Sequence, residues 1–142
     1  FHNPIFLEVF DLFTRGLQDR GLRPLLVNLS DDMAPEESVR MVRQYSVDGV
    51  IVASSTLKPT FARAFKEAGI PVVHSFGRHT TSPKVHVVGI DNVESGRMAA
   101  RELVACGYRD IGFLGGPEAA TSTQDRYTGF ASELARRRMM SG

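Results

Sequence analysis

The chain has 142 residues, of which 42% are hydrophobic and 23% charged, as in an ordinary globular domain with a real core. No apolar stretch approaches the roughly 20 residues of a membrane helix, and no cationic leader precedes an apolar run as a secretory signal requires. The formal net charge is +1 and the basic residues are scattered, so the clustered Lys and Arg of DNA-binding surfaces are missing.

The first predicted element is an amphipathic helix. Apolar residues recur at three- and four-residue spacing, and acidic and basic residues take the other side. Asn3 and Pro4 predict an N-cap and first helical residue, and Gly21 predicts the end of the helix. The apolar side consists of Phe6, Val9, Phe10, Phe13 and Leu17.

Strand-like and helical segments alternate along the rest of the chain. Strands are predicted at 25–29, 49–53, 71–73, 85–90 and 111–114, and the apolar run 49–53 is typical of a strand covered on both faces. Between them, a helix begins at Pro35, one ends at Gly69, one is capped by Asp91-Asn92 and ends at Gly107, and a last one follows. Their predicted inward residues are Val39, Val42 and Tyr45; Phe61, Ala64, Phe65 and Ala68; Gly96, Ala100, Leu103 and Val104; and Tyr127, Phe130, Ala131 and Leu134.

The short connections imply right-handed crossovers, and therefore a doubly wound parallel α/β sheet with helices on both faces. In such sheets ligands bind in the crevice beyond the carboxyl ends of the strands. Candidate site residues are therefore sought just after each strand and at the start of each helix. Because no strand precedes the first helix and the sequence stops after the last one, we expect the chain to be a fragment.

Six segments stand out when the chain is read in order: Asn-Pro-Ile-Phe at 3–6, Asp-Gly-Val-Ile-Val at 48–52, Gly-Ile-Pro-Val-Val at 69–73, Val-Gly-Ile-Asp-Asn at 88–92, residues 107–117, and Arg-Tyr-Thr-Gly-Phe at 126–130. In this order they resemble the effector-binding domain of the LacI/GalR repressor family, which has the type I periplasmic-binding-protein fold. Two departures stand out. Ser75, Phe76 and Gly77 lie where the family often has an Asp, and Tyr108 lies where it often has a His.

The resemblance implies that residues 1–108 form the N-terminal lobe without its first strand, and that residues 109–142 begin the C-terminal lobe. The DNA-binding helix-turn-helix and most of the second lobe would lie outside this sequence. It further implies a ligand-sensing domain of a repressor that responds to a small sugar-like effector bound between the lobes. The partners implied are that effector, a second copy of the chain in a homodimer, and DNA through the missing head domain.

A second hypothesis is a periplasmic sugar-binding protein of a transporter, which would use the same cleft but carry a signal sequence. An enzyme is the third, and we do not expect one, because no activated nucleophile, acid–base pair or cofactor loop is visible. No Gly-x-Ser-x-Gly elbow, dinucleotide fingerprint or metal-ligand spacing of the four histidines is present, so neither cofactor nor metal is expected. The single cysteine, Cys106, excludes an internal disulfide and fits a reducing, cytoplasmic compartment without membrane attachment.

Arg126 is the first candidate for ligand contact. It lies at the start of the last helix, beyond a predicted strand end, and its planar fork of donors suits vicinal hydroxyls or a carboxylate. A cation near a helix N-terminus is mildly unfavourable, which favours a function over a merely solvated arginine. The resemblance places an effector-contacting arginine at this position.

The other candidates each have a structural alternative. Asp91 and Asn3 can accept hydrogen bonds from hydroxyls or simply cap their helices. Ile5 and Phe6, in the first turn of the first helix, and Phe76, after a strand, can wall a pocket or pack in a core or loop. Ser54 and Ser122 can donate to a ligand, although serines at strand ends are also common in turns.

Overall fold

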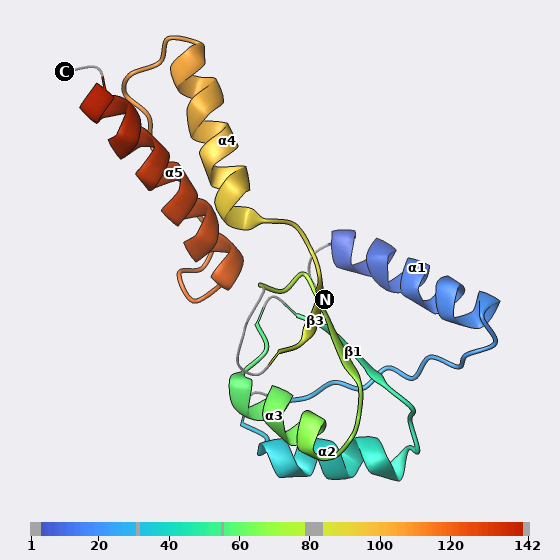
Figure 1. Cartoon of the computed structure of the whole chain (residues 1–142). Coiled ribbons are helices and arrows are strands. Elements are labelled where there is room, and N and C mark those ends of the chain that lie inside the picture. Colours follow the sequence, from blue (N-terminus) through green and yellow to red (C-terminus); the bar gives the residue numbers. More distant parts are fainter. Residues whose placement is uncertain (1–3, 31, 55, 79–83, 141–142) are drawn as a thin grey trace. The chain divides into compact units, whose positions relative to one another are not determined.

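The computed structural model describes residues 4–30, 32–54, 56–78 and 84–140 (Figure 1). The chain divides into two compact units, Phe1–Met33 and Ala34–Gly142. The first contains helix α1 (Pro4–Asp19), whose start and end agree with the prediction. The predicted apolar side of α1 is half-buried, while Ile5, Leu7 and Leu12 are more than half exposed.

Three helix ends share one backbone motif, at the glycines predicted to stop them. Gly21, Gly69 and Gly107 have φ angles of 74°, 73° and 90°. In each case the glycine N–H and the next N–H donate to carbonyls of the last turn, as in a Schellman motif. A Cβ at any of the three would meet nothing within 4 Å, so the backbone angle alone requires glycine.

The strand predicted at 25–29 is absent. Residues 22–30 have no strand hydrogen bonding, and Leu25 and Leu26 are 52% and 53% exposed. An apolar run favours an extended backbone, but a strand exists only where a neighbour pairs with it. Among the described residues no strand pairs with this segment.

The second unit contains a three-stranded parallel sheet of order β1-β2-β3, which confirms the predicted parallel α/β pattern. The strands are β1 (Val50–Ala53), β2 (Val72–Ser75) and β3 (His86–Val88). Val50 pairs with Val72, and Val73 pairs with His86. In the chain, helix α2 (Pro35–Gln44) precedes β1 and helix α3 (Pro59–Glu67) follows it. Helices α4 (Asn92–Ala105) and α5 (Thr121–Met140) come after the last strand.

A core forms where α2 and α3 pack on the sheet. Its buried residues are Val39, Val42 and Phe65, packed against Val47, Val50, Phe61, Ala64, Ala68, Ile70 and Val72. Tyr45 was predicted to belong to this face but is 55% exposed, because it is the C-cap of α2 and lies past its last helical turn.

Ile51 is 42% exposed, so the prediction that β1 is covered on both faces is wrong for the described chain. Successive residues of β1 point to opposite faces of the sheet, and α2 and α3 pack on the face to which Val50 points.

Helices α4 and α5 pack side by side along most of their length (Figure 1).

The strand predicted at 111–114 is absent. Instead, the Phe113 ring contacts Tyr127 and Phe130 of α5, with ring centres 5.3 and 5.4 Å away, and Leu114 is fully exposed. Tyr127 was predicted to point inward but is 54% exposed, because it meets Phe113 by its edge at the rim of the pair. The lobe boundary after residue 108 remains a prediction, and α4 and α5, on either side of it, pack together.

Candidate functional site

Ser54, Phe76 and Asp91 lie just beyond β1, β2 and β3, respectively. Because the three strands are parallel and adjacent, these positions share the carboxyl edge of one sheet. This is the edge where ligands bind in open α/β sheets. The topology therefore brings three of the predicted residues to the expected place.

The turn after β2 is tightly built. Phe76 has a φ of 64°, which is unfavourable for a side chain of its size, and its N–H donates to the Val88 carbonyl at 2.7 Å. His74 is 95% buried, and its Nε2 hydrogen-bonds with the carbonyl oxygen of Ser54. The His74 ring fills the space beside Gly77, where a Cβ would overlap it. This turn is therefore held in one conformation next to the end of β1.

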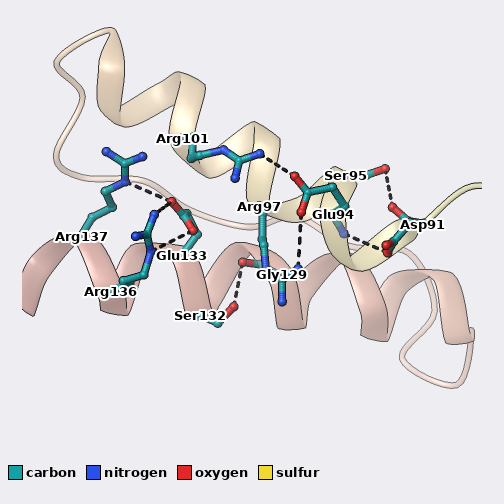
Figure 2. Close-up of polar contacts among 10 residues, drawn as sticks. All are labelled: Asp91, Glu94, Ser95, Arg97, Arg101, Gly129, Ser132, Glu133, Arg136 and Arg137. Carbon is teal, nitrogen blue, oxygen red and sulfur yellow. Dashed lines mark hydrogen bonds and ion pairs between the residues drawn. The ribbon is translucent and has the colours of Figure 1, made fainter.

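Asp91 is the N-cap of α4. One carboxylate oxygen accepts the Glu94 N–H at 3.1 Å, and the Asp91 carbonyl accepts the Ser95 hydroxyl at 3.0 Å (Figure 2). The capping interpretation is thus confirmed, while ligand contact by the exposed carboxylate remains a prediction. The two roles are compatible, because a carboxylate has two oxygens and about four acceptor positions.

Arg126 lies on α5 and reaches back to α4. Its Nε donates to the Oδ1 of Asn92 at 2.9 Å, and Asn92 directly follows Asp91. Arg126 is exposed, and its guanidinium makes this hydrogen bond to the neighbouring helix. The Arg126 guanidinium therefore lies at the start of α4, beside Asn92, and Asp91 is the residue just before Asn92 in the chain. Its contact with a ligand remains a prediction.

A second arginine lies at this edge, and no pattern in the sequence predicted it. Arg78, three residues beyond β2, donates from Nε and NH2 to the two carboxylate oxygens of Asp125 at 3.0 and 2.7 Å. Asp125 immediately precedes Arg126 in the chain. Two positioning roles were also not predicted, that of Asn92, which binds Arg126, and that of His74, which binds the Ser54 carbonyl. For Asn92 a signal was present, because it stands beside Asp91 at a predicted helix start.

The other predicted site residues lie on the helices α5 and α1 or outside the described residues. Ser122 is the second residue of α5, half-buried and one turn ahead of Arg126 on the same helix face. Ile5 and Phe6 lie in the first turn of α1, in the unit that ends at Met33. Asn3 lies outside the described residues. A role for these four in binding remains a prediction.

Two glutamates on α4 and α5 each bind two arginines (Figure 2). Glu133 is 4% exposed and pairs with Arg136 at 2.7 Å and Arg137 at 3.0 Å. The hydrogen bond from Arg136, more than that from Arg137, lowers the pKa of Glu133 to about 2 although burial opposes the change. Glu94 pairs with Arg101 and Arg97, and the hydrogen bond from Arg101 is the main cause of its lowered pKa. Glu133 lies in the middle of α5, whereas Glu94 lies in the first turn of α4, where its backbone N–H donates to the Asp91 carboxylate.

A pocket of about 330 Å³ opens at the opposite, amino edge of β2 and β3. It is lined by Ala62, Lys66, Gly69, Ile70, Pro71, Val72, Lys84, Val85 and His86. None of the predicted site residues lines it. The described residues contain no group of three or more His, Cys, Asp or Glu side chains that could hold a metal ion.

Residues 2–138 match the model of the family described as periplasmic binding proteins and sugar binding domain of LacI family. The chain belongs to this family. The repressor PurR of Pectobacterium carotovorum is 29% identical over 134 residues, which are 92% of this chain and 39% of PurR. The chain thus spans about two fifths of the length of this curated relative.

Solved structures show that this family member has the expected fold. A LacI family transcriptional regulator from Silicibacter pomeroyi superposes with a TM-score of 0.78 at 24% identity, covering 96% of this chain and 51% of that one. A periplasmic binding protein/LacI transcriptional regulator from Alkaliphilus metalliredigens, complexed with D-xylulofuranose, gives a TM-score of 0.71 at 25% identity, covering 96% and 50%. These matches confirm the fold class and the resemblance inferred from the six segments. No helix among the described residues is both long and apolar enough to span a membrane.

Proposed function

We propose that this chain is the ligand-sensing part of a DNA-binding transcriptional repressor that responds to a small sugar-like effector. The observation that carries the proposal is the hydrogen bond from Arg126 to Asn92. This bond holds a cationic donor beside the Asp91 acceptor, at the strand ends where this fold binds ligands. Support also comes from curated relatives such as PurR, which is named a transcriptional repressor, and from the relative complexed with D-xylulofuranose.

The chemistry of the candidate residues suits a polyhydroxylated guest. The Asp91 carboxylate can accept hydrogen bonds from hydroxyl groups, and the NH groups of Arg126 can donate to their oxygens. Phe76 and Phe6 supply apolar surface for the C–H face of a sugar ring, and Ile5 adds to it. Asn3, Ser54 and Ser122 would add neutral polar contacts. A ligand bound in this way is recognised by hydrogen bonds and by stacking, with no covalent step.

In the intact regulator the effector would bind between two lobes, with residues 1–108 in the first and the second beginning at residue 109. It would shift the DNA-binding heads between competent and incompetent states only through different affinities for the two. We further propose that the regulator is a homodimer, acts in the cytoplasm and has no enzymatic activity. DNA would be contacted by a head domain that this sequence does not contain.

A periplasmic sugar-binding protein is the second candidate, because the matched family includes periplasmic binding proteins as well as LacI-type domains. It would use the same residues for the sugar. The two candidates differ in what the ligand controls, namely operator DNA affinity in one case and delivery to a transporter in the other.

The test uses the intact regulator and a panel of D-xylulose, D-ribose, D-glucose and guanosine. A ligand at 100 times its Kd stabilises the folded protein by about 2.7 kcal/mol, so a specific ligand raises the melting temperature. Arg126→Ala should weaken binding of that ligand about 10- to 100-fold, because it removes charge-assisted hydrogen bonds. Arg63→Ala, at an exposed position of α3, is the matched control and should bind normally.

The second measurement is operator affinity with and without the ligand. A ligand that binds but leaves operator affinity unchanged would contradict the repressor and favour the transport protein. Normal binding by Arg126→Ala would contradict the assignment of the site.

A further inference from the structure

The ion pair of Arg78 and Asp125 joins two segments 47 residues apart in the chain. Both contacts are short, at 3.0 Å from Nε to Oδ2 and 2.7 Å from NH2 to Oδ1. Two parallel bonds between a guanidinium and a carboxylate fix the orientation of both groups as well as their distance. The pair therefore acts as an oriented link between the turn after β2 and the second turn of α5.

This link is only partly shielded from water. The Asp125 side chain is 18% exposed and that of Arg78 is 47% exposed. Exposed ion pairs contribute about 0.2–1 kcal/mol, so the pair stabilises a geometry without dominating the folding free energy. Such a link suits the positioning of a neighbouring side chain.

The neighbour is Arg126. Asp125 and Arg126 are consecutive residues of α5, and consecutive side chains of a helix point about 100° apart. Asp125 binds Arg78 of the turn after β2, whereas Arg126 binds Asn92 at the start of α4. The two contacts therefore tie the same turn of α5 to two different segments, the start of α4 and the turn after β2.

We propose that Arg78 and Asp125 are a positioning pair that orients Arg126 toward the carboxyl edge of the sheet and thereby sets its affinity for the effector. The effector part of this inference rests on the proposed function. Neither Arg78 nor Asp125 touches the effector in this proposal. The close packing of α4 on α5 fixes α5 against α4, whereas the ion pair links α5 to the turn after β2.

The first test needs no ligand. The hydrogen exchange rate of the Arg126 Nε–H, followed by NMR in the intact regulator, reports on its bond to Asn92. Asp125→Asn should raise this rate about two- to fivefold, corresponding to the range of an exposed ion pair. Asp11→Asn is the matched control, because Asp11 also binds an arginine, Arg15, at 2.7 Å, and it should leave the rate unchanged.

Two further variants separate the pairing from a mere effect on folding. The charge reversal Arg78→Asp with Asp125→Arg should bring the exchange rate back toward that of the unaltered chain. Arg78→Lys keeps the charge but loses the two-pronged geometry, so it should give an intermediate rate. An unchanged rate in Asp125→Asn, or no recovery in the charge reversal, would overturn the proposal.

The second test uses the intact regulator and D-xylulose as the probe. Asp125→Asn should raise the Kd two- to fivefold, and the charge reversal should lower it again. If D-xylulose binds equally well to all variants, the effect on affinity is refuted. If it binds to none, including the unaltered protein, the result counts against this sugar as effector, and the exchange measurement still decides whether the pair orients Arg126.

Discussion

Gly129 of α5 lies directly against the carbonyl of Val93 in α4. A Cβ at Gly129 would overlap the Val93 carbonyl oxygen and lie 2.8 Å from its carbon, and a Cβ at Gly96 would overlap the Arg126 carbonyl oxygen in the same way. Backbone meets backbone at both places, so no flexible side chain can move aside. The two glycines set the distance between the helices, and with it the place of Arg126 beside Asn92.

Gly129→Ala should therefore destabilise the chain by about 1–3 kcal/mol, the usual cost of overpacking. The control is Gly16→Ala in α1, where the nearest atom to a Cβ is the end of the Arg20 side chain at 3.7 Å. That variant should be up to about 1 kcal/mol more stable, because alanine favours helices over glycine. Urea unfolding of the variants measures both differences. Equal effects of the two substitutions would show that the helices do not meet at Gly129.

Asp91→Asn separates capping from ligand binding. Asn and Asp cap helices about equally well, so the unfolding free energy should change little, whereas Asp91→Ala should cost about 1 kcal/mol. If the carboxylate accepts hydrogen bonds from the effector, Asp91→Asn should still weaken binding. Calorimetric titration beside urea unfolding gives both values. Unchanged affinity in Asp91→Asn would leave Asp91 as a cap alone.

Gly77→Ala should disturb the turn after β2, because the new methyl group would overlap the buried His74 ring. That ring is held by the Ser54 carbonyl, so it cannot move without losing a hydrogen bond. We expect a loss of about 1–3 kcal/mol. Gly112→Ala is the control, since a Cβ there meets nothing within 4 Å. Thermal unfolding compares the two, and equal melting temperatures would contradict the packing of His74 on Gly77.

The carboxyl group of Glu133 should titrate near pH 2, well below the ordinary value of 4.5. A lowered pKa in the folded state means that the ion pairs stabilise the chain fully above about pH 4.5. This contribution is lost as the pH falls through the folded pKa of about 2. Arg136→Ala should raise the pKa more than Arg137→Ala, because the Arg136 hydrogen bond is the larger cause. NMR titration of the Glu133 side-chain carbon measures the shift, and the reverse order would contradict the assigned geometry.

Much of the helical structure followed from the sequence. The glycines at 21, 69 and 107 ended their helices, and Pro4, Pro35 and Asp91 marked helix starts, because caps are local chemistry that a few neighbouring residues decide. The strands β1, β2 and β3 were also predicted, as short apolar runs between helices. From their alternation came the parallel order, and hence the shared edge for Ser54, Phe76 and Asp91.

The sequence did not show which apolar segments pair as strands, or which face of a strand is covered by helices. Residues 25–29 and 111–114 have the same apolar character as β1, yet no strand in the described part of the chain pairs with them. Ile51 is exposed on a strand that was predicted to be covered on both faces. The bonds of Arg126 to Asn92 and of Arg78 to Asp125 also depend on residues 34 and 47 positions apart. Local sequence determines which conformation a segment prefers. Which distant segment meets it is decided by packing of the whole chain, because strand pairing and ion pairing gain free energy only when both partners are brought together.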